Sequence, residues 1–186
     1  PYANKMLSGG SGGIGSGTSF IPLVESGVET MSSSLANSLT FNDLGNDLDT
    51  VVSLHGVSGY TYSQLKKGTA PYSTAMTQVT NAKNAATALG RVSKVIGVTS
   101  IHGETDNFNG VSGATYQGYL EEWQNDYDTD VKAITGQTSE VPLFIDQMSS
   151  FMSSYANDPT SEIPIYQLYA AEANPGEIVL VAPKYF

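Results

Sequence analysis

The chain contains no cysteine, and this absence excludes disulfide bonds, thiolate zinc sites, iron–sulfur clusters and a cysteine nucleophile. Histidine is also scarce, because His55 and His102 are the two in the sequence, too few for a multi-histidine metal site. No apolar run approaches the ~20 residues of a membrane-spanning helix. The longest run, Ile178 to Ala182, has the length of a strand. The sequence therefore predicts no metal, no cofactor and no membrane insertion.

Basic residues are few as well: 8 Lys and Arg face 18 Asp and Glu, which gives a net charge of -10. Phosphate contacts need clustered Lys and Arg, so this balance argues against a nucleic-acid partner and against an anionic membrane surface. Charged residues make up only 14% of the chain, and a surface rich in Ser, Thr and Gly favours a secreted, cell-surface or virion-associated protein. The 186 residues, 40% of them apolar, predict a single domain over residues 1–186 with its own core.

Four short runs predict buried strands, because they are rich in β-branched residues and apolar on both faces. These runs are Val51–His55, Val95–Ile101, Val141–Gln147 and Ile178–Ala182. Segments with helical spacing lie between and before them, at Leu35–Leu48, Met76–Leu89, Tyr116–Ile134 and about 159–173. This alternation predicts βαβ units in a mainly parallel α/β sheet.

Ligands of such sheets bind at the carboxyl ends of the strands, where this sequence has polar loops. The first strand runs into residues 55–60 and the second into residues 102–107, so both histidines are expected at the same end of one sheet. Ser58 and Tyr60 in the first of these loops, and Gln147 at the polar exit of the third strand, are candidate substrate-binding residues. Tyr60 and Tyr62 suit stacking on a sugar ring or packing in the core, and both interpretations stay open.

Gly10–Gly15 fits the G-x-G-x-x-G pattern, but a dinucleotide loop needs a strand before it and a helix after it, and neither is predicted. The segment is interpreted as a flexible surface loop. Ser58 is a poor nucleophile, because a nucleophile elbow needs glycine at position 60, which is Tyr. Gly59 serves better as a backbone N–H donor to an oxyanion, or else forms a tight turn.

The block from His102 to Asp106 places an imidazole, a glycine and two carboxylates within five residues. This pattern suits catalysis, since a carboxylate orients a histidine and N–H groups bind an oxyanion, or else it is a solvated acidic loop. Asp126, Asp128 and Asp130 alternate like part of a calcium loop but lack its glycine and final glutamate, so they indicate a solvated helix face.

Taken in order along the chain, these motifs resemble the SGNH/GDSL-type hydrolases, and within them the sialate O-acetylesterase and acetylxylan esterase branch, carbohydrate esterase family six. The segments that carry the resemblance are Phe20–Glu25, Val51–Gly59, Tyr62–Gly68 and Ile101–Asp106. The resemblance implies a three-layer α/β/α flavodoxin-like fold. It also implies a serine ester hydrolase that removes O-acetyl groups from carbohydrate without a cofactor.

Carried over residue by residue, the resemblance makes Gly59 the oxyanion donor of the second family block. Gly103, Glu104, Thr105 and Asp106 match the G-E-S-D part of the third block, with Thr in place of Ser. Gly103 and Thr105 are then further oxyanion candidates, and Glu104 is the candidate acid of the triad. His102 stands where the family usually has Gln and can donate a hydrogen bond that depends on pH.

The sequence departs from the family at both ends. It has no G-D-S or G-Q-S loop around Ser8 or Ser11 and no D-x-x-H block, so the nucleophile and the general base are expected outside the chain. The first strand and last helix of the fold are expected to be missing too, and the 186 residues alone to be inactive. One alternative is an inactive binding or structural module of this fold in a viral, surface or filament-like assembly, and another is a flavin- or phosphate-binding flavodoxin-like protein.

Overall fold

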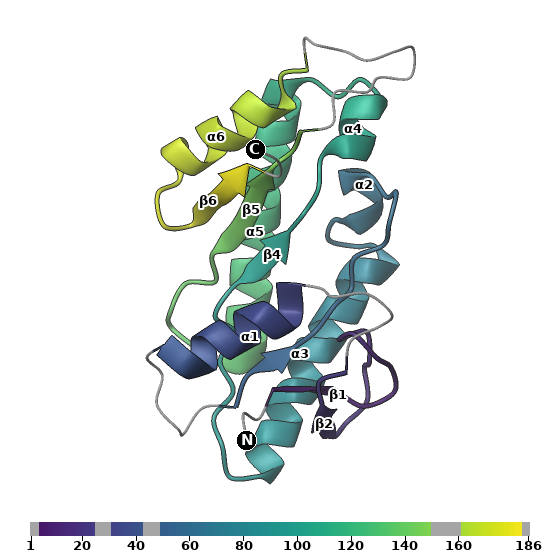
Figure 1. Cartoon of the computed structure of the whole chain (residues 1–186), viewed down its shortest axis with the longest axis vertical. Coiled ribbons are helices and arrows are strands. Elements are labelled where there is room, and N and C mark those ends of the chain that lie inside the picture. Colours follow the sequence, from purple (N-terminus) through teal and green to yellow (C-terminus); the bar gives the residue numbers. More distant parts are fainter. Residues whose placement is uncertain (1–3, 25–30, 43–48, 150–160, 184–186) are drawn as a thin grey trace. The chain divides into compact units, whose positions relative to one another are not determined.

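The computed structural model of the chain describes residues 4–24, 31–42, 49–149 and 161–183 (Figure 1). These residues form two compact units, one from residues 1–56 and 70–94 and the other from residues 57–69 and 95–186. Each unit is described by itself. The prediction of one domain over residues 1–186 stays a prediction.

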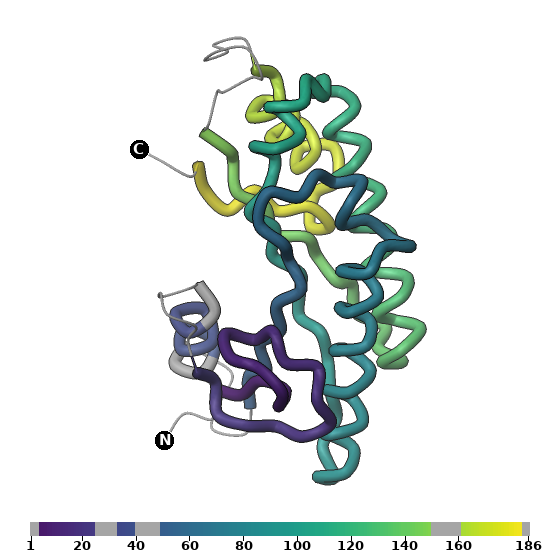
Figure 2. The backbone as a smooth tube through the Cα atoms, turned by 90° about the vertical axis from the view of Figure 1, so that its right-hand side faces the viewer, coloured from purple at the N-terminus to yellow at the C-terminus, as the bar shows by residue number. Residues whose placement is uncertain are grey.

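The first unit is built around a small mixed sheet in the order β2-β1-β3. The central strand β1 (Lys5–Leu7) runs antiparallel to β2 (Phe20–Pro22) and parallel to β3 (Val51–Val52). Met6 and Leu7 of β1 are 0% and 1% exposed, which places β1 in the core of this unit. Two helices complete it, α1 (Met31–Asn42) and α3 (Ala70–Ala88). In Figure 2 the loop after β1 lies beside α3.

Helix α3 confirms the predicted helix, and Gly90 ends it. Gly90 has a φ of 69°, and the N–H of Arg91 donates to the carbonyl of Ala86, as in a Schellman motif. The buried residues are Tyr72, Ala75, Gln78, Ala85 and Ala86, whereas Leu89 is 61% exposed. Of the apolar residues at helical spacing, Ala86 is buried, Met76, Val79 and Ala82 are half-buried and Leu89 is exposed, while Gln78 is buried with its hydrogen bonds.

The second unit has an all-parallel sheet in the order β4-β5-β6. Its strands are β4 (Val98–Ser100), β5 (Leu143–Gln147) and β6 (Ile178–Pro183). Its helices are α2 (Tyr62–Leu65), α4 (Glu104–Phe108), α5 (Gly113–Thr135) and α6 (Ile163–Ala173). Helices α5 and α6 pack against each other and against this sheet (Figure 1).

Helix α5 follows the sequence pattern most closely. The Ser112 side chain caps its first turn by accepting the N–H of Thr115, and Gly136 ends the helix in the left-handed conformation. Its buried residues include Tyr116, Leu120, Trp123, Tyr127 and Val131, the stripe that the spacing predicts. Helix α6 also confirms the predicted fourth helix from Ile163 onward, while residues 159 and 160 lie outside the described residues.

The structure thus confirms a mixed α/β protein with a parallel sheet. The four predicted strands exist but are divided between two sheets of the described residues, because β3 pairs with β1 and the other three pair among themselves. The first predicted strand is reduced to two residues, and Val51 is 36% exposed rather than buried. Positions 44 and 48 of the first predicted helix lie outside the described residues. In the part of the chain that the structure describes, no helix is long and apolar enough to cross a membrane.

Candidate functional site

Two of the polar loops singled out in the sequence meet in the second unit. The N–H of Tyr62 donates to Asp106 Oδ2 at 2.9 Å, and His102 Nε2 lies 3.1 Å from the Tyr60 carbonyl oxygen. The first loop leads into α2 and the second into α4, so each loop ends in a short helix. Residues 57–62 and 102–106 are called the paired loops below.

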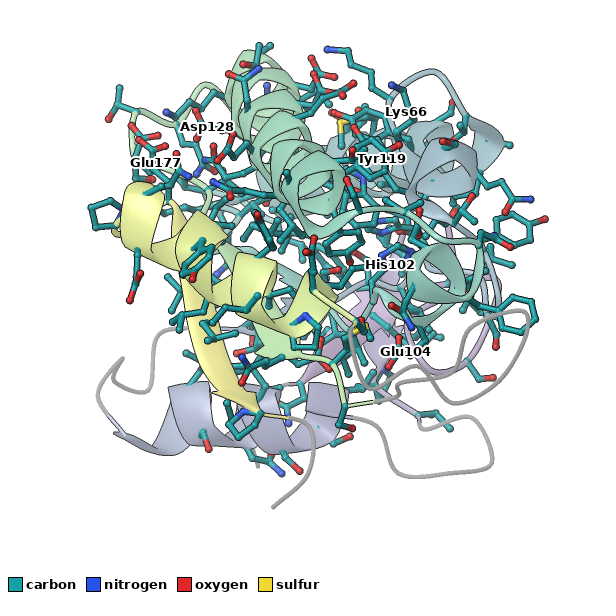
Figure 3. The ribbon with its side chains drawn as sticks, turned by 90° about the horizontal axis from the view of Figure 1, so that it is seen from above. Lys66, His102, Glu104, Tyr119, Asp128 and Glu177 are labelled. Atoms are coloured by element: carbon teal, nitrogen blue, oxygen red, sulfur yellow. The ribbon has the colours of Figure 1, made fainter. Side chains whose placement is uncertain are left out.

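His102 occupies a nearly closed position in this contact, because its side chain is only 10% exposed. Its Nδ1 lies 2.8 Å from the Tyr116 hydroxyl, and its Nε2 lies 3.5 Å from Asp106 Oδ2. The imidazole is nearly parallel to the Tyr116 ring and meets the Trp123 ring edge-on. In Figure 3 His102 lies between α4 and α5.

Burial is the main cause of the pKa shifts of the groups around His102. It raises the pKa of the Asp106 carboxyl group, against the opposing effects of the Tyr62 N–H bond and of His102. Burial also raises the pKa of Tyr116 well above its ordinary value, and the neighbouring carboxylates of Asp106, Asp146 and Glu104 add to this increase. Tyr116 therefore keeps its hydroxyl hydrogen at ordinary pH and is able to donate it to a neighbouring acceptor.

Gly103 lies at the start of α4 with a φ of 132°, a conformation that side chains rarely allow. A Cβ at this position would come within 3.0 Å of the Met148 sulfur and 3.3 Å of the Tyr116 hydroxyl. The predicted oxyanion role of Gly103 stays a prediction, but the packing alone explains why glycine stands here. Gln167 braces the same region, since its Nε2 donates to the His102 carbonyl and its Oε1 accepts the Met148 N–H.

Gly59 differs from Gly103 in being exposed, with a φ of 77° and open space where a Cβ would project. Ser58 is also exposed, and Tyr60 is 37% exposed beside the contact. Tyr62 is only 1% exposed and stacks on Tyr119 with ring centroids 4.1 Å apart. The structure thereby resolves one open alternative, because Tyr62 belongs to the core and Tyr60 remains accessible.

The positions of three other predicted site residues, Glu104, Thr105 and Gln147, are as follows. Glu104 and Thr105 are half-buried in the first turn of α4. Glu104 is labelled in Figure 3. The Gln147 side chain donates to the carbonyl of Pro164 at 2.9 Å, which ties its amide to the start of α6. Tyr116 and Gln167 also belong to the site, although the sequence did not predict them as members. Tyr116 falls in the apolar stripe of α5, and nothing in that spacing distinguishes its hydroxyl.

The first unit holds the glycine-rich segment, and here an expectation was wrong. The segment is not a loose loop, because Gln78 Nε2 lies within 3.1–3.3 Å of the carbonyl oxygens of Gly13, Gly15 and Leu54. Asn81 also donates to the Ser16 carbonyl at 2.8 Å. Polar side chains on α3 thus fix a loop that its composition marks as flexible.

A strand also precedes this segment, which the sequence analysis did not find. β1 ends at Leu7, directly before Ser8, and its three residues are too few to show a strand pattern. The glycine pattern therefore has a strand before it, but β2 rather than a helix follows. Both Ser8 and Ser11 come shortly after the carboxyl end of a buried strand, a context that the sequence analysis assigned to a serine outside the chain.

The two histidines follow different sheets, which corrects the expectation of a single sheet edge. His55 comes after β3 in the first unit, and His102 comes after β4 in the second. The difference arises because β3 pairs with β1. His55 is half-buried, and this burial lowers its pKa to about 4.

The alternating aspartates lie on α5, as expected of a charged helix face. Lys67 lies 2.8 Å from Asp130 and 3.8 Å from Asp126, and Lys132 lies 2.7 Å from Asp128. Among the residues that the structure describes, no group of three or more His, Asp or Glu side chains is arranged to hold a metal ion. The paired loops therefore offer hydrogen-bond donors, carboxylates and an imidazole as their chemistry.

Comparison with known proteins finds no relative of this chain. The chain matches no protein-family model, and neither a curated protein nor a solved structure shows significant similarity to it.

Proposed function

We propose that the protein is a serine-type ester hydrolase that removes O-acetyl groups from carbohydrate, with the three-layer α/β/α arrangement of the SGNH class. The observation that supports this proposal most is the contact between the paired loops through Asp106 and Tyr62. One of these loops holds the predicted oxyanion donor, and the other holds the predicted charged catalytic block. A hydrolase needs these two groups close together, and the two loops are in contact within one compact unit.

Gly59 is the residue of the paired loops best suited to bind an oxyanion. It is exposed, it lacks a side chain, and its positive φ turns the backbone sharply at the loop tip. A backbone N–H directed at a developing oxyanion typically contributes ~10²–10³ in rate. The exposed ring of Tyr60, the next residue, offers a flat surface for a sugar.

The chemistry follows the usual course for an ester. A serine Oγ attacks the acetyl carbonyl carbon, a base takes the hydroxyl proton, and the oxyanion receives hydrogen bonds. The tetrahedral intermediate collapses, the sugar oxygen leaves with the proton, and an acetyl-serine remains. Water then attacks this ester, and acetate leaves. Glu104 is the proposed carboxylate that orients the base, as the resemblance implies.

A fluorophosphonate, which reacts with activated serines, tests the proposal together with an acetyl-ester assay. Because the nucleophile and the general base are expected outside these 186 residues, we expect the full-length protein to release acetate from an acetylated xylan or sialate. One labelled serine should be identified by peptide mass spectrometry, and its replacement by alanine should abolish both the label and the release of acetate. Ser73→Ala, at an exposed position of α3, is the control and should keep both.

If no serine is labelled and no acetate is released, the hydrolase proposal is wrong. Binding of the acetylated sugar without release of acetate would then favour the alternative of a binding module.

A further inference from the structure

The paired loops are joined by hydrogen bonds that end on the backbone of one loop and on side chains of the other. Asp106 accepts the N–H of Tyr62, and His102 Nε2 lies within hydrogen-bond distance of the Tyr60 carbonyl. Two backbone atoms on either side of Thr61 are thereby held by the block at 102–106. Gly59 immediately precedes this fixed pair.

The proton positions on His102 follow from its partners. A backbone carbonyl only accepts, so Nε2 carries the hydrogen that points at Tyr60. Nδ1 then lacks a hydrogen in the neutral ring and accepts the O–H of Tyr116, a hydroxyl that stays protonated. Both nitrogens of the ring are engaged in the folded protein. A histidine in this state is poorly placed to take a proton from a nucleophile.

Residues 57–60 need such a constraint, because all four are exposed and apolar packing does little to hold them. The turn within them is weak, with the Tyr60 N–H 3.3 Å from the Val57 carbonyl. An oxyanion donor functions only if it is held close to its productive position. The nearest firm attachment is the pair of bonds at Tyr60 and Tyr62.

We propose that His102 and Asp106 are positioning residues, which hold the loop of Gly59 through the Tyr60 carbonyl and the Tyr62 N–H, and that neither transfers a proton in the reaction. This inference rests on the proposed function for its catalytic consequence. The bonds themselves are measurable whether or not the protein hydrolyses esters.

Two histidine variants separate the positioning role from proton transfer. His102→Gln retains an N–H donor near the Tyr60 carbonyl but has no titrating ring, whereas His102→Leu has no donor. We expect His102→Gln to keep kcat within about threefold and His102→Leu to lose kcat by roughly 10²-fold with little change in KM, as loss of one oxyanion donor does. Equal loss of kcat in both variants would overturn the proposal.

Backbone amide exchange measured by NMR tests the bonds without any assay of activity. In Asp106→Leu the Tyr62 amide loses its acceptor, and we expect it to exchange about tenfold faster, while Asp106→Asn keeps most of the protection.

The imidazole nitrogen shifts of His102 should report the Nε2–H form, with His55→Gln used to assign the two histidines. An unchanged Tyr62 amide in both Asp106→Leu and His102→Leu, or the Nδ1–H form of His102, would overturn the proposal even if esterase activity is found. If the wild type shows no esterase activity but the Tyr62 amide responds as expected, the proposed function fails and the positioning contact stands.

Discussion

The buried carboxylate of Asp106 accepts the N–H of Tyr62, a residue 44 positions earlier in the chain. Tyr62 is the first residue of α2, so this bond satisfies one of the N–H groups that a helix leaves without a partner in its first turn. Asp106 itself sits in the first turn of α4 and is 2% exposed. One side chain thus joins the beginnings of two short helices.

Removal of the Asp106 carboxylate should destabilise the second unit. Asp106→Leu leaves the Tyr62 N–H buried without an acceptor and removes the carboxylate that faces His102, at a cost of roughly 1–3 kcal/mol. Asp106→Asn, which retains an acceptor oxygen, should lose less than half of that. Trp123 is the single tryptophan of the chain, and its ring packs edge-on against Tyr62 and His102. Urea unfolding followed by tryptophan fluorescence therefore reports on this unit.

Equal stability of the leucine and asparagine variants in that experiment would contradict the role assigned to the Tyr62 bond. Ser58→Ala is a suitable control, because Ser58 is exposed on the same loop.

Acid should destabilise the first unit through His55. Burial lowers the pKa of His55 from 6.5 to about 4, so between these values the unfolded chain binds the proton and the folded chain does not. Stability from this group is fully present above pH 6.5 and is lost as the pH falls to about 4. At 1.36 kcal/mol per pKa unit, the loss amounts to at most about 3 kcal/mol.

A comparison with His55→Gln isolates this effect, since glutamine does not titrate. The unfolding free energy of the wild type should fall more steeply between pH 7 and pH 4 than that of the variant. Parallel pH profiles for the two proteins would show that His55 is as accessible to protons in the folded chain as in the unfolded one.

The sequence predicted those parts of the fold that depend on local pattern. Helix α5 was recognisable because a long apolar stripe and a terminal glycine act within the segment itself. The sheet partners of β3 were not, since a two-residue strand carries no pattern that selects a neighbour. The same limit applied to the site. The loops at 55–60 and 102–107 were found from their unusual polar residues, whereas Tyr116 and Gln167 join the paired loops through tertiary hydrogen bonds.

Two glycine substitutions should have opposite effects on stability. In Gly15→Ala the new Cβ would overlap the Leu7 carbonyl oxygen, which belongs to rigid backbone in the core of the first unit. Gly118 lies in α5 with nothing near its missing Cβ, so Gly118→Ala should stabilise by up to about 1 kcal/mol through helix propensity. Thermal unfolding should therefore show a lower Tm for the first variant and a higher one for the second. A neutral Gly15→Ala would mean that the loop is free to move away from β1.

Gln78 should control the order of the glycine-rich loop. Its amide nitrogen faces three carbonyl oxygens, of Gly13, Gly15 and Leu54, and the side chain is 1% exposed. Gln78→Leu fills much the same space but removes the amide that these three carbonyls share, which costs roughly 1–3 kcal/mol. The Gly13 carbonyl still accepts the Leu54 N–H. The Leu54 N–H, which donates to Gly13, is the local probe, and its exchange should be about tenfold faster or more in this variant. Thr77→Ala, on the exposed side of the same helix, should leave that exchange unchanged. Slow exchange at Leu54 in Gln78→Leu would show that the strand pairing of β1 and β3 holds the loop without the glutamine.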